Sequence, residues 1–163
     1  LYERISRDWW VLYRARVTTR AVDIKDGALE LLGLARSLGL PLALATSTHT
    51  ELANTKLRLA GLDRFFASIV GGDKVTRTKP HPEPYLTATR ALGFAPDECW
   101  AIEDSDNGVR AAHAAGLLVF QVPDLVQPSA AVRGLGHSIV DNLRDIARLL
   151  AEQARGRPRS RAW

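Results

Sequence analysis

Three short groups of polar residues are of the types that act on a phosphate group or a metal ion. Hydroxyls occur at Thr46, Ser47 and Thr48, an ammonium group at Lys79, and two adjacent carboxylates at residues 103–104. Hydroxyls and the N–H groups at the start of a helix bind anions. A lysine neutralises a phosphate oxygen, and Mg²⁺ takes one or two carboxylates together with water and phosphate oxygens. These residue types are therefore those of a magnesium-dependent phosphate site.

Each group also has a simpler explanation. The Thr46 hydroxyl group fits an ordinary helix N-cap, and Lys79 fits a surface lysine. Of the carboxylates, one fits a cap for helix 106–115 and the other fits a solvent-facing side chain. Against this, charge at the end of a buried strand is costly unless a cation compensates it. The combination and order of the three groups, more than any one of them, favour a site.

The elements that must position these residues can be read from the apolar pattern. Short apolar runs predict buried strands, and segments with a helical apolar stripe alternate with them. The expected strands are 40–47, 68–70, 99–104, 117–122 and 138–140. The expected helices are 1–17, 27–37, 49–60, one from about residue 82, 106–115, and a last one after Asp141, which fits its N-cap.

This alternation predicts an α/β fold, a doubly wound parallel sheet with helices on both faces. In such sheets ligands bind at the carboxyl ends of the strands. The three polar groups stand at strand ends or in the loop that leads to the next helix. We therefore expect them to meet at one edge of the sheet.

Three stretches of the sequence carry a family resemblance: LALATSTHTE, KPHPEPYLTATRALG and AIEDSDNGVRAAHAAG, with VPDLVQPS after the fifth strand. They resemble the haloacid dehalogenase superfamily, in the subgroup of β-phosphoglucomutase-like and phosphoglycolate-phosphatase-like enzymes. The resemblance covers roughly residues 24–150. It implies a Rossmann-like core over 21–150, with 1–20 as the end of a helical cap domain.

The resemblance also implies roles for individual residues. Thr46 matches the phosphate-binding hydroxyl, with the Ser47 amide beside it, and Lys79 matches the lysine that stabilises the transferring phosphoryl group. Asp104 matches a Mg²⁺ ligand, and Glu103 matches a second acidic position that ligates Mg²⁺ directly or through water. Further candidates for substrate contact are Thr48, His49 and Asn107.

The first motif of the family, an apolar strand ending in Asp-x-Asp-Gly, has no clear counterpart. Its first aspartate is the nucleophile and its second is the general acid and base. Asp23 and Asp26 before Gly27 are one residue too far apart, and no apolar strand precedes them. Since the chain opens on Leu1 and contains no Met, we expect it to be part of a longer protein whose preceding segment holds the nucleophile.

The expected activity is hydrolysis of a small phosphorylated metabolite, a sugar phosphate or phosphoglycolate type, with Mg²⁺ and through an aspartyl-phosphate. Two alternatives remain: a phosphomutase of the β-phosphoglucomutase type, and an inactive fragment that binds Mg²⁺ and phosphate. A signalling receiver domain combines similar residues, but there the acidic pair precedes the hydroxyl and the lysine. Here the acidic pair comes last.

Composition limits the partners. The net charge is +4, but four arginines lie within 155–161, and the remaining 18 basic residues equal the 18 acidic ones. A neutral body with a basic tail does not indicate nucleic-acid binding, and we expect 151–163 to be disordered. We expect no membrane association, because no apolar run reaches the length of a span. A cytoplasmic monomer or homodimer is the expected form.

Overall fold

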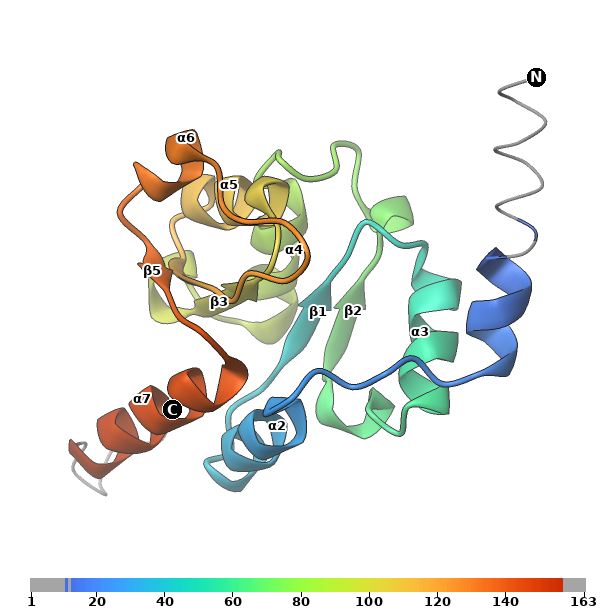
Figure 1. Cartoon of the computed structure of the whole chain (residues 1–163), viewed down its shortest axis with the longest axis horizontal. Coiled ribbons are helices and arrows are strands. Elements are labelled where there is room, and N and C mark those ends of the chain that lie inside the picture. The colour runs from blue at the N-terminus through green and yellow to red at the C-terminus, as the bar shows by residue number, and fades with distance from the viewer. Residues whose placement is uncertain (1–10, 12, 157–163) are drawn as a thin grey trace.

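The computed structural model describes residues 11 and 13–156, and every strand in it pairs in parallel (Figure 1). The strands are β1 (Ala43–Ala45), β2 (Ser68–Val70), β3 (Trp100–Glu103), β4 (Leu118–Gln121) and β5 (Ser138–Ile139). The helices are α2 (Ala28–Ser37), α3 (Thr50–Leu59), α4 (Glu83–Leu92), α5 (Asp106–Ala114), α6 (Ala130–Arg133) and α7 (Leu143–Gly156). The expected α/β class with parallel strands is confirmed.

The strands form two sheets instead of the single expected sheet. One has the order β1-β2 and the other β3-β4-β5. Apolar packing joins them: Ala45 of β1 packs against a buried cluster that includes Ala101 of β3. Leu42, just before β1, and Trp100 of β3 both pack against a second buried cluster. Helix α4 contacts β1, β2 and α5, so it also spans the two sheets. The strand ends are thus held in one body by side chains and a helix.

The carboxyl-terminal part differs from the expectation in two of its helices, α6 and α7. Helix α6 was not predicted, because a four-residue helix is too short to show a period. Helix α7 continues to Gly156, so 151–156 are helical and only 157–163 of the expected tail lie outside the described residues. The apolar stripe explains this, since Ala151 and Ala154 are partly buried.

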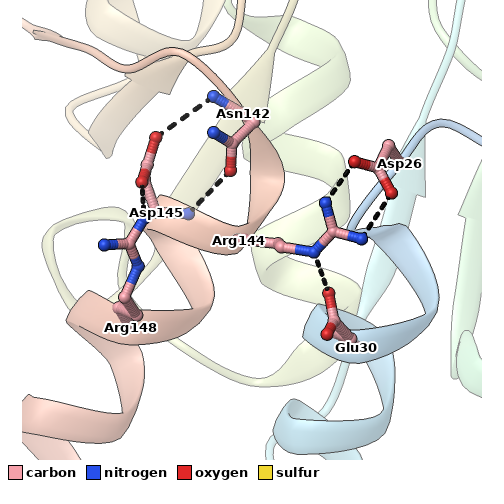
Figure 2. Close-up of polar contacts among 6 residues, drawn as sticks. All are labelled: Asp26, Glu30, Asn142, Arg144, Asp145 and Arg148. Carbon is pink, nitrogen blue, oxygen red and sulfur yellow. Dashed lines mark hydrogen bonds and ion pairs between the residues drawn. The ribbon is translucent and has the colours of Figure 1, made fainter.

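The start of α7 is capped by Asn142 and not by Asp141. The backbone N–H of Asp145 donates to the Asn142 side chain at 3.1 Å, and the N–H of Asn142 donates to the Asp145 carboxylate at 3.3 Å (Figure 2). This reciprocal pair has the form of a capping box and fixes the first turn of the helix.

Of the first expected helix, 1–17, the structure describes residues 11 and 13–17, which are helical; the helix continues to residue 19 and lies beside α3 (Figure 1). The Lys56 ammonium of α3 donates to the Tyr13 hydroxyl at 3.1 Å, and Val17 is buried. Residues 1–10 lie outside the described part. Across the residues described here, no helix has the length and apolar character to cross a membrane.

Candidate active site

The acidic pair lies at the end of β3, where the strand leads into α5. Glu103 is the last residue of the strand, with a buried side chain, whereas Asp104 in the following bend is exposed. Ser105 caps α5 by accepting a hydrogen bond from the Gly108 amide at 3.2 Å. Neither acidic residue is therefore used as the helix cap, and that simpler explanation of the pair is wrong.

Lys79 reaches Glu103 directly, although 24 residues separate them. The Lys79 ammonium donates to Glu103 Oε1, and the two side chains are 11% and 7% exposed. Lys79 is therefore not a surface lysine. A buried charge needs a close partner of opposite sign, and each of these two groups supplies it for the other.

Tyr85 completes this cluster, although the sequence alone does not single it out as a site residue. Its hydroxyl also donates to Glu103 Oε1, and the Lys79 ammonium lies 3.3 Å from that hydroxyl and 4.9 Å from the ring centre. Burial, followed by the negative charge of Glu103, raises the pKa of Tyr85, so the phenol stays protonated. A tyrosine in the first turn of a helix has an ordinary explanation as a core residue, so its position in the sequence carries no separate signal.

The Glu103 carboxylate packs directly against Gly108, which has no side chain. A Cβ atom added at Gly108 would overlap with the Glu103 carboxylate, whose Oε2 accepts a hydrogen bond from the Ser105 hydroxyl at 3.3 Å. The close approach of α5 to β3 at this point therefore requires glycine. We call Lys79, Tyr85, Glu103, Ser105 and Gly108 the Lys79 cluster.

The loop that contains Lys79 is held in place by Glu83 at the start of α4. The Glu83 carboxylate accepts backbone hydrogen bonds from Thr76 at 2.7 Å and from Arg77 at 3.1 Å. The first of these bonds is the main reason that the pKa of Glu83 is lowered. His81 is structural within the turn, since its Nδ1 accepts from the Glu83 amide at 3.1 Å.

The hydroxyl group follows β1, as expected. The Thr46 hydroxyl accepts a hydrogen bond from the Thr48 amide at 3.1 Å, and the Thr46 amide donates to Val70 of β2 at 2.9 Å. Ser47 and His49 are exposed. The structure thus forms a tight turn, 46–49, before α3.

The structure brings only some of the expected site residues into contact. Lys79 and Glu103 touch, and Asp104 follows Glu103 in the chain. Within the described part of the chain, no hydrogen bond or ion pair joins the 46–49 turn to Lys79 or to the acidic pair, and Asn107 is exposed in the first turn of α5.

Asp26 is used elsewhere. Both its carboxylate oxygens accept from the Arg144 guanidinium, which also donates to Glu30 at 2.7 Å (Figure 2). We call these three residues the Arg144 cluster. It ties the start of α2 to the start of α7, so Asp26 serves helix packing in this structure.

The described residues offer few side chains that could bind a metal ion at this site. The described residues contain no group of three or more His, Cys, Asp or Glu side chains that could hold a metal ion. Asp104 offers an exposed carboxylate, whereas Oε1 of Glu103 already accepts from Lys79 and Tyr85. Two adjacent carboxylates fit Mg²⁺, which keeps water and phosphate oxygens in its shell.

Sequence comparisons connect this chain to enzymes that act on phosphates. The phosphoglycolate phosphatase of Escherichia coli (strain K12) is 33% identical over 113 residues, which cover 69% of this chain and 45% of that protein. The chain therefore spans less than half the length of this relative.

Solved structures give the same connection. A HAD family hydrolase from Deinococcus radiodurans R1, with bound phosphate and sodium, superposes with a TM-score of 0.74 at 33% identity, over 86% of this chain and 63% of that one. A proposed beta-phosphoglucomutase from Thermotoga maritima superposes with a TM-score of 0.71 at 34% identity, over 78% and 59%. Residues 2–116 match the sequence pattern of the haloacid dehalogenase-like hydrolases. This chain belongs to the haloacid dehalogenase-like hydrolase family.

Proposed function

We propose that the complete protein hydrolyses a small phosphorylated metabolite, of the sugar-phosphate or phosphoglycolate type, with Mg²⁺ as cofactor. The contact between Lys79 and the buried Glu103, directly beside the exposed Asp104, carries this proposal. It brings a cation and a carboxylate together at the end of β3, with a second carboxylate next in the chain. The phosphoglycolate phosphatase of E. coli and the phosphate bound to the D. radiodurans hydrolase support the same class of substrate.

The residues of this chain would act on the phosphate by charge and hydrogen bonding. Lys79 would neutralise one phosphoryl oxygen, and the Thr46 hydroxyl and Ser47 amide would donate to others. Such donors stabilise the charge that spreads over these oxygens during phosphoryl transfer. Glu103 and Tyr85 keep the Lys79 ammonium in place before substrate arrives, since both contact it.

Asp104 and Glu103 would hold the Mg²⁺ ion. When bound, Mg²⁺ supplies positive charge next to the phosphate oxygens. The exposed carboxylate of Asp104 is the more accessible of the two, because Glu103 is buried and hydrogen-bonded within the Lys79 cluster.

The nucleophile in this proposal is an aspartate of the complete protein that stands N-terminal in sequence to all the elements described above. One of its carboxylate oxygens bonds to phosphorus while the bond to the alcohol oxygen breaks, and water then cleaves the aspartyl-phosphate to inorganic phosphate. We place this aspartate on a strand between β1 and β3, the strands that precede the 46–49 turn and the acidic pair. This position is supported by the strand order, because β1 and β3 belong to different sheets and are not hydrogen-bonded to each other.

The test is phosphate release by the complete protein from phosphoglycolate and a panel of sugar phosphates, with Mg²⁺ and with a chelator. We expect Mg²⁺-dependent release, and a loss of about 10²- to 10³-fold in kcat for Lys79→Ala. Lys74→Ala is the matched control, because Lys74 is exposed in the preceding loop. Full activity of Lys79→Ala would remove the site assignment, and no release from any substrate would refute the function.

A phosphomutase is the second candidate, favoured by the similarity to the proposed beta-phosphoglucomutase of T. maritima. It would return the phosphoryl group to a sugar hydroxyl instead of to water. Product analysis on a hexose phosphate separates the two: an isomeric hexose phosphate indicates a mutase, and inorganic phosphate indicates a phosphatase.

A further inference from the structure

The side chain of Asp73 contacts the start of α3. It lies in a short 3-10 turn, Gly72–Lys74, directly after β2. Its Oδ1 accepts two hydrogen bonds from Thr50, from the backbone amide at 2.6 Å and from the hydroxyl at 2.7 Å. Thr50 is the first residue of α3 and follows the 46–49 turn. Asp73 therefore connects the loop after β2 to the proposed phosphate-binding turn.

The backbone of the two loops is also in direct contact. The Gly72 amide donates to the Thr48 carbonyl at 3.0 Å. A Cβ atom at Gly71 would lie 2.5 Å from the Thr50 amide nitrogen, and one at Gly72 would lie 2.7 Å from the Ser47 carbonyl oxygen. Since real Cβ atoms do not approach backbone this closely, both glycines are needed for the loops to touch.

The charge of Asp73 changes what the start of α3 can bind. The Thr50 hydroxyl, followed by the Thr50 amide, lowers the pKa of Asp73 to about 2, so the group is ionised at neutral pH. A helix N-terminus favours an anion, but here a carboxylate of the protein already takes the Thr50 amide. A bound phosphate would therefore depend on donors earlier in the turn, at Thr46 and Ser47.

We propose that Asp73 is a positioning residue that fixes the 46–49 turn against the end of β2, so that Thr46 and Ser47 can donate to a phosphate. The part of this proposal that concerns phosphate binding rests on the function proposed above. Its effect on the turn rests only on the contacts with Thr50 and on the close approach of the two loops.

The experiment uses backbone amide hydrogen exchange over 46–50 in Asp73→Ala and Asp73→Asn. Loss of a capping side chain should speed exchange there by about tenfold in Asp73→Ala. Asp73→Asn keeps an acceptor oxygen and should restore most of the protection. Thr50→Ala removes only the hydroxyl bond and gives a milder version of the same change.

Glu98→Ala is the matched control. The Glu98 carboxylate likewise accepts a backbone hydrogen bond, from Ala95 at 2.9 Å, at the start of another 3-10 turn. This variant should leave exchange over 46–50 unchanged. If Asp73→Ala speeds exchange over 46–50 no more than Glu98→Ala does, the inference is overturned.

Kinetics of the complete protein separate this inference from the proposed function. We expect Asp73→Ala to raise KM by about tenfold, and Asp73→Asn to return it close to the wild-type value. A wild-type KM in Asp73→Ala, with activity lost in Lys79→Ala, would overturn the inference and leave the function standing. Faster exchange over 46–50 in a protein that hydrolyses no phosphate ester would refute the function and support the positioning of the turn.

Discussion

The Lys79 cluster and the Arg144 cluster use the same chemistry in opposite surroundings. Each joins a cation to carboxylate oxygens, from segments far apart in the sequence. The Lys79 and Glu103 side chains are 11% and 7% exposed, whereas those of Arg144 and Asp26 are 50% and 72% exposed. Water can replace a lost partner in the second cluster but not in the first.

This difference separates two uses of charge in the molecule. The Arg144 cluster joins α2 to α7 at the surface, where its loss would leave solvated groups (Figure 2). The Lys79 cluster holds an ammonium group at the end of β3, where an apolar side chain would be enough to pack the core. The candidate site thus contains buried charges, whose desolvation costs free energy, whereas the contact between α2 and α7 uses exposed charges that stay solvated.

The largest effect should come from removing one buried partner. Lys79→Met leaves the Glu103 carboxylate buried beside Tyr85 without its cation. We expect the free energy of unfolding to fall by about 3–5 kcal/mol, measured by urea denaturation. The double variant Lys79→Met/Glu103→Leu removes both charges and should recover part of this loss. A fall below about 1 kcal/mol in the single variant would show that the two clusters do not differ in this way.

Filling the space at Gly108 should have the next largest effect. Gly108→Ala forces the Glu103 carboxylate to move, at a cost of about 1–3 kcal/mol in unfolding free energy. Gly33→Ala is the matched control, because Gly33 lies in α2 with no atom near its added Cβ. That variant should stabilise the protein by about 0.5–1 kcal/mol. Equal stability of the two variants would contradict the close packing of α5 on the carboxylate.

Tyr85→Phe tests one hydrogen bond within the buried cluster. It removes the hydroxyl that donates to Glu103 and keeps the ring under the Lys79 ammonium. We expect a loss of about 1 kcal/mol. Combined with Lys79→Met in a double-mutant cycle, the two losses should not add, because both residues contact the same carboxylate oxygen. Simple additivity would mean that the contacts are independent.

Breaking the exposed cluster should have the smallest effect. Arg144→Met removes the ion pairs with Asp26 and Glu30, and we expect a smaller loss of unfolding free energy than in any of the buried variants, because water solvates the groups that are left. Added salt should reduce this loss, since exposed charges are screened. A loss as large as that of Lys79→Met, and unchanged by added salt, would show that the exposed cluster stabilises the fold as strongly as the buried one.

Much of the fold could be predicted from the sequence, because short apolar runs and helical stripes are local signals. Residues 68–70 were expected as a strand and form β2, and most other elements end within a few residues of the expectation. The division into two sheets could not be predicted, because strand pairing depends on segments far apart in the chain. The end of the last helix was missed because weakly apolar alanines, Ala151 and Ala154, continue its inner face.

The candidate site was predictable in composition but not in contacts. The sequence indicated Lys79 and Glu103 separately, whereas their direct contact arises from tertiary packing. Tyr85 and Asp73 were missed, since a tyrosine in a helix and an aspartate after two glycines both have ordinary structural explanations. Their roles become visible only from their contacts in the structure: Tyr85 binds the Glu103 carboxylate, and Asp73 binds the start of α3.

Helix α4 has a consequence for how the molecule unfolds. It begins a few residues after Lys79 and contacts β1 and β2 of one sheet and α5, which packs on the other. Two sheets without such a connection would open as separate cooperative units. Helix α4 should therefore make them lose structure together, so that the most protected amides of both sheets exchange through a single global event.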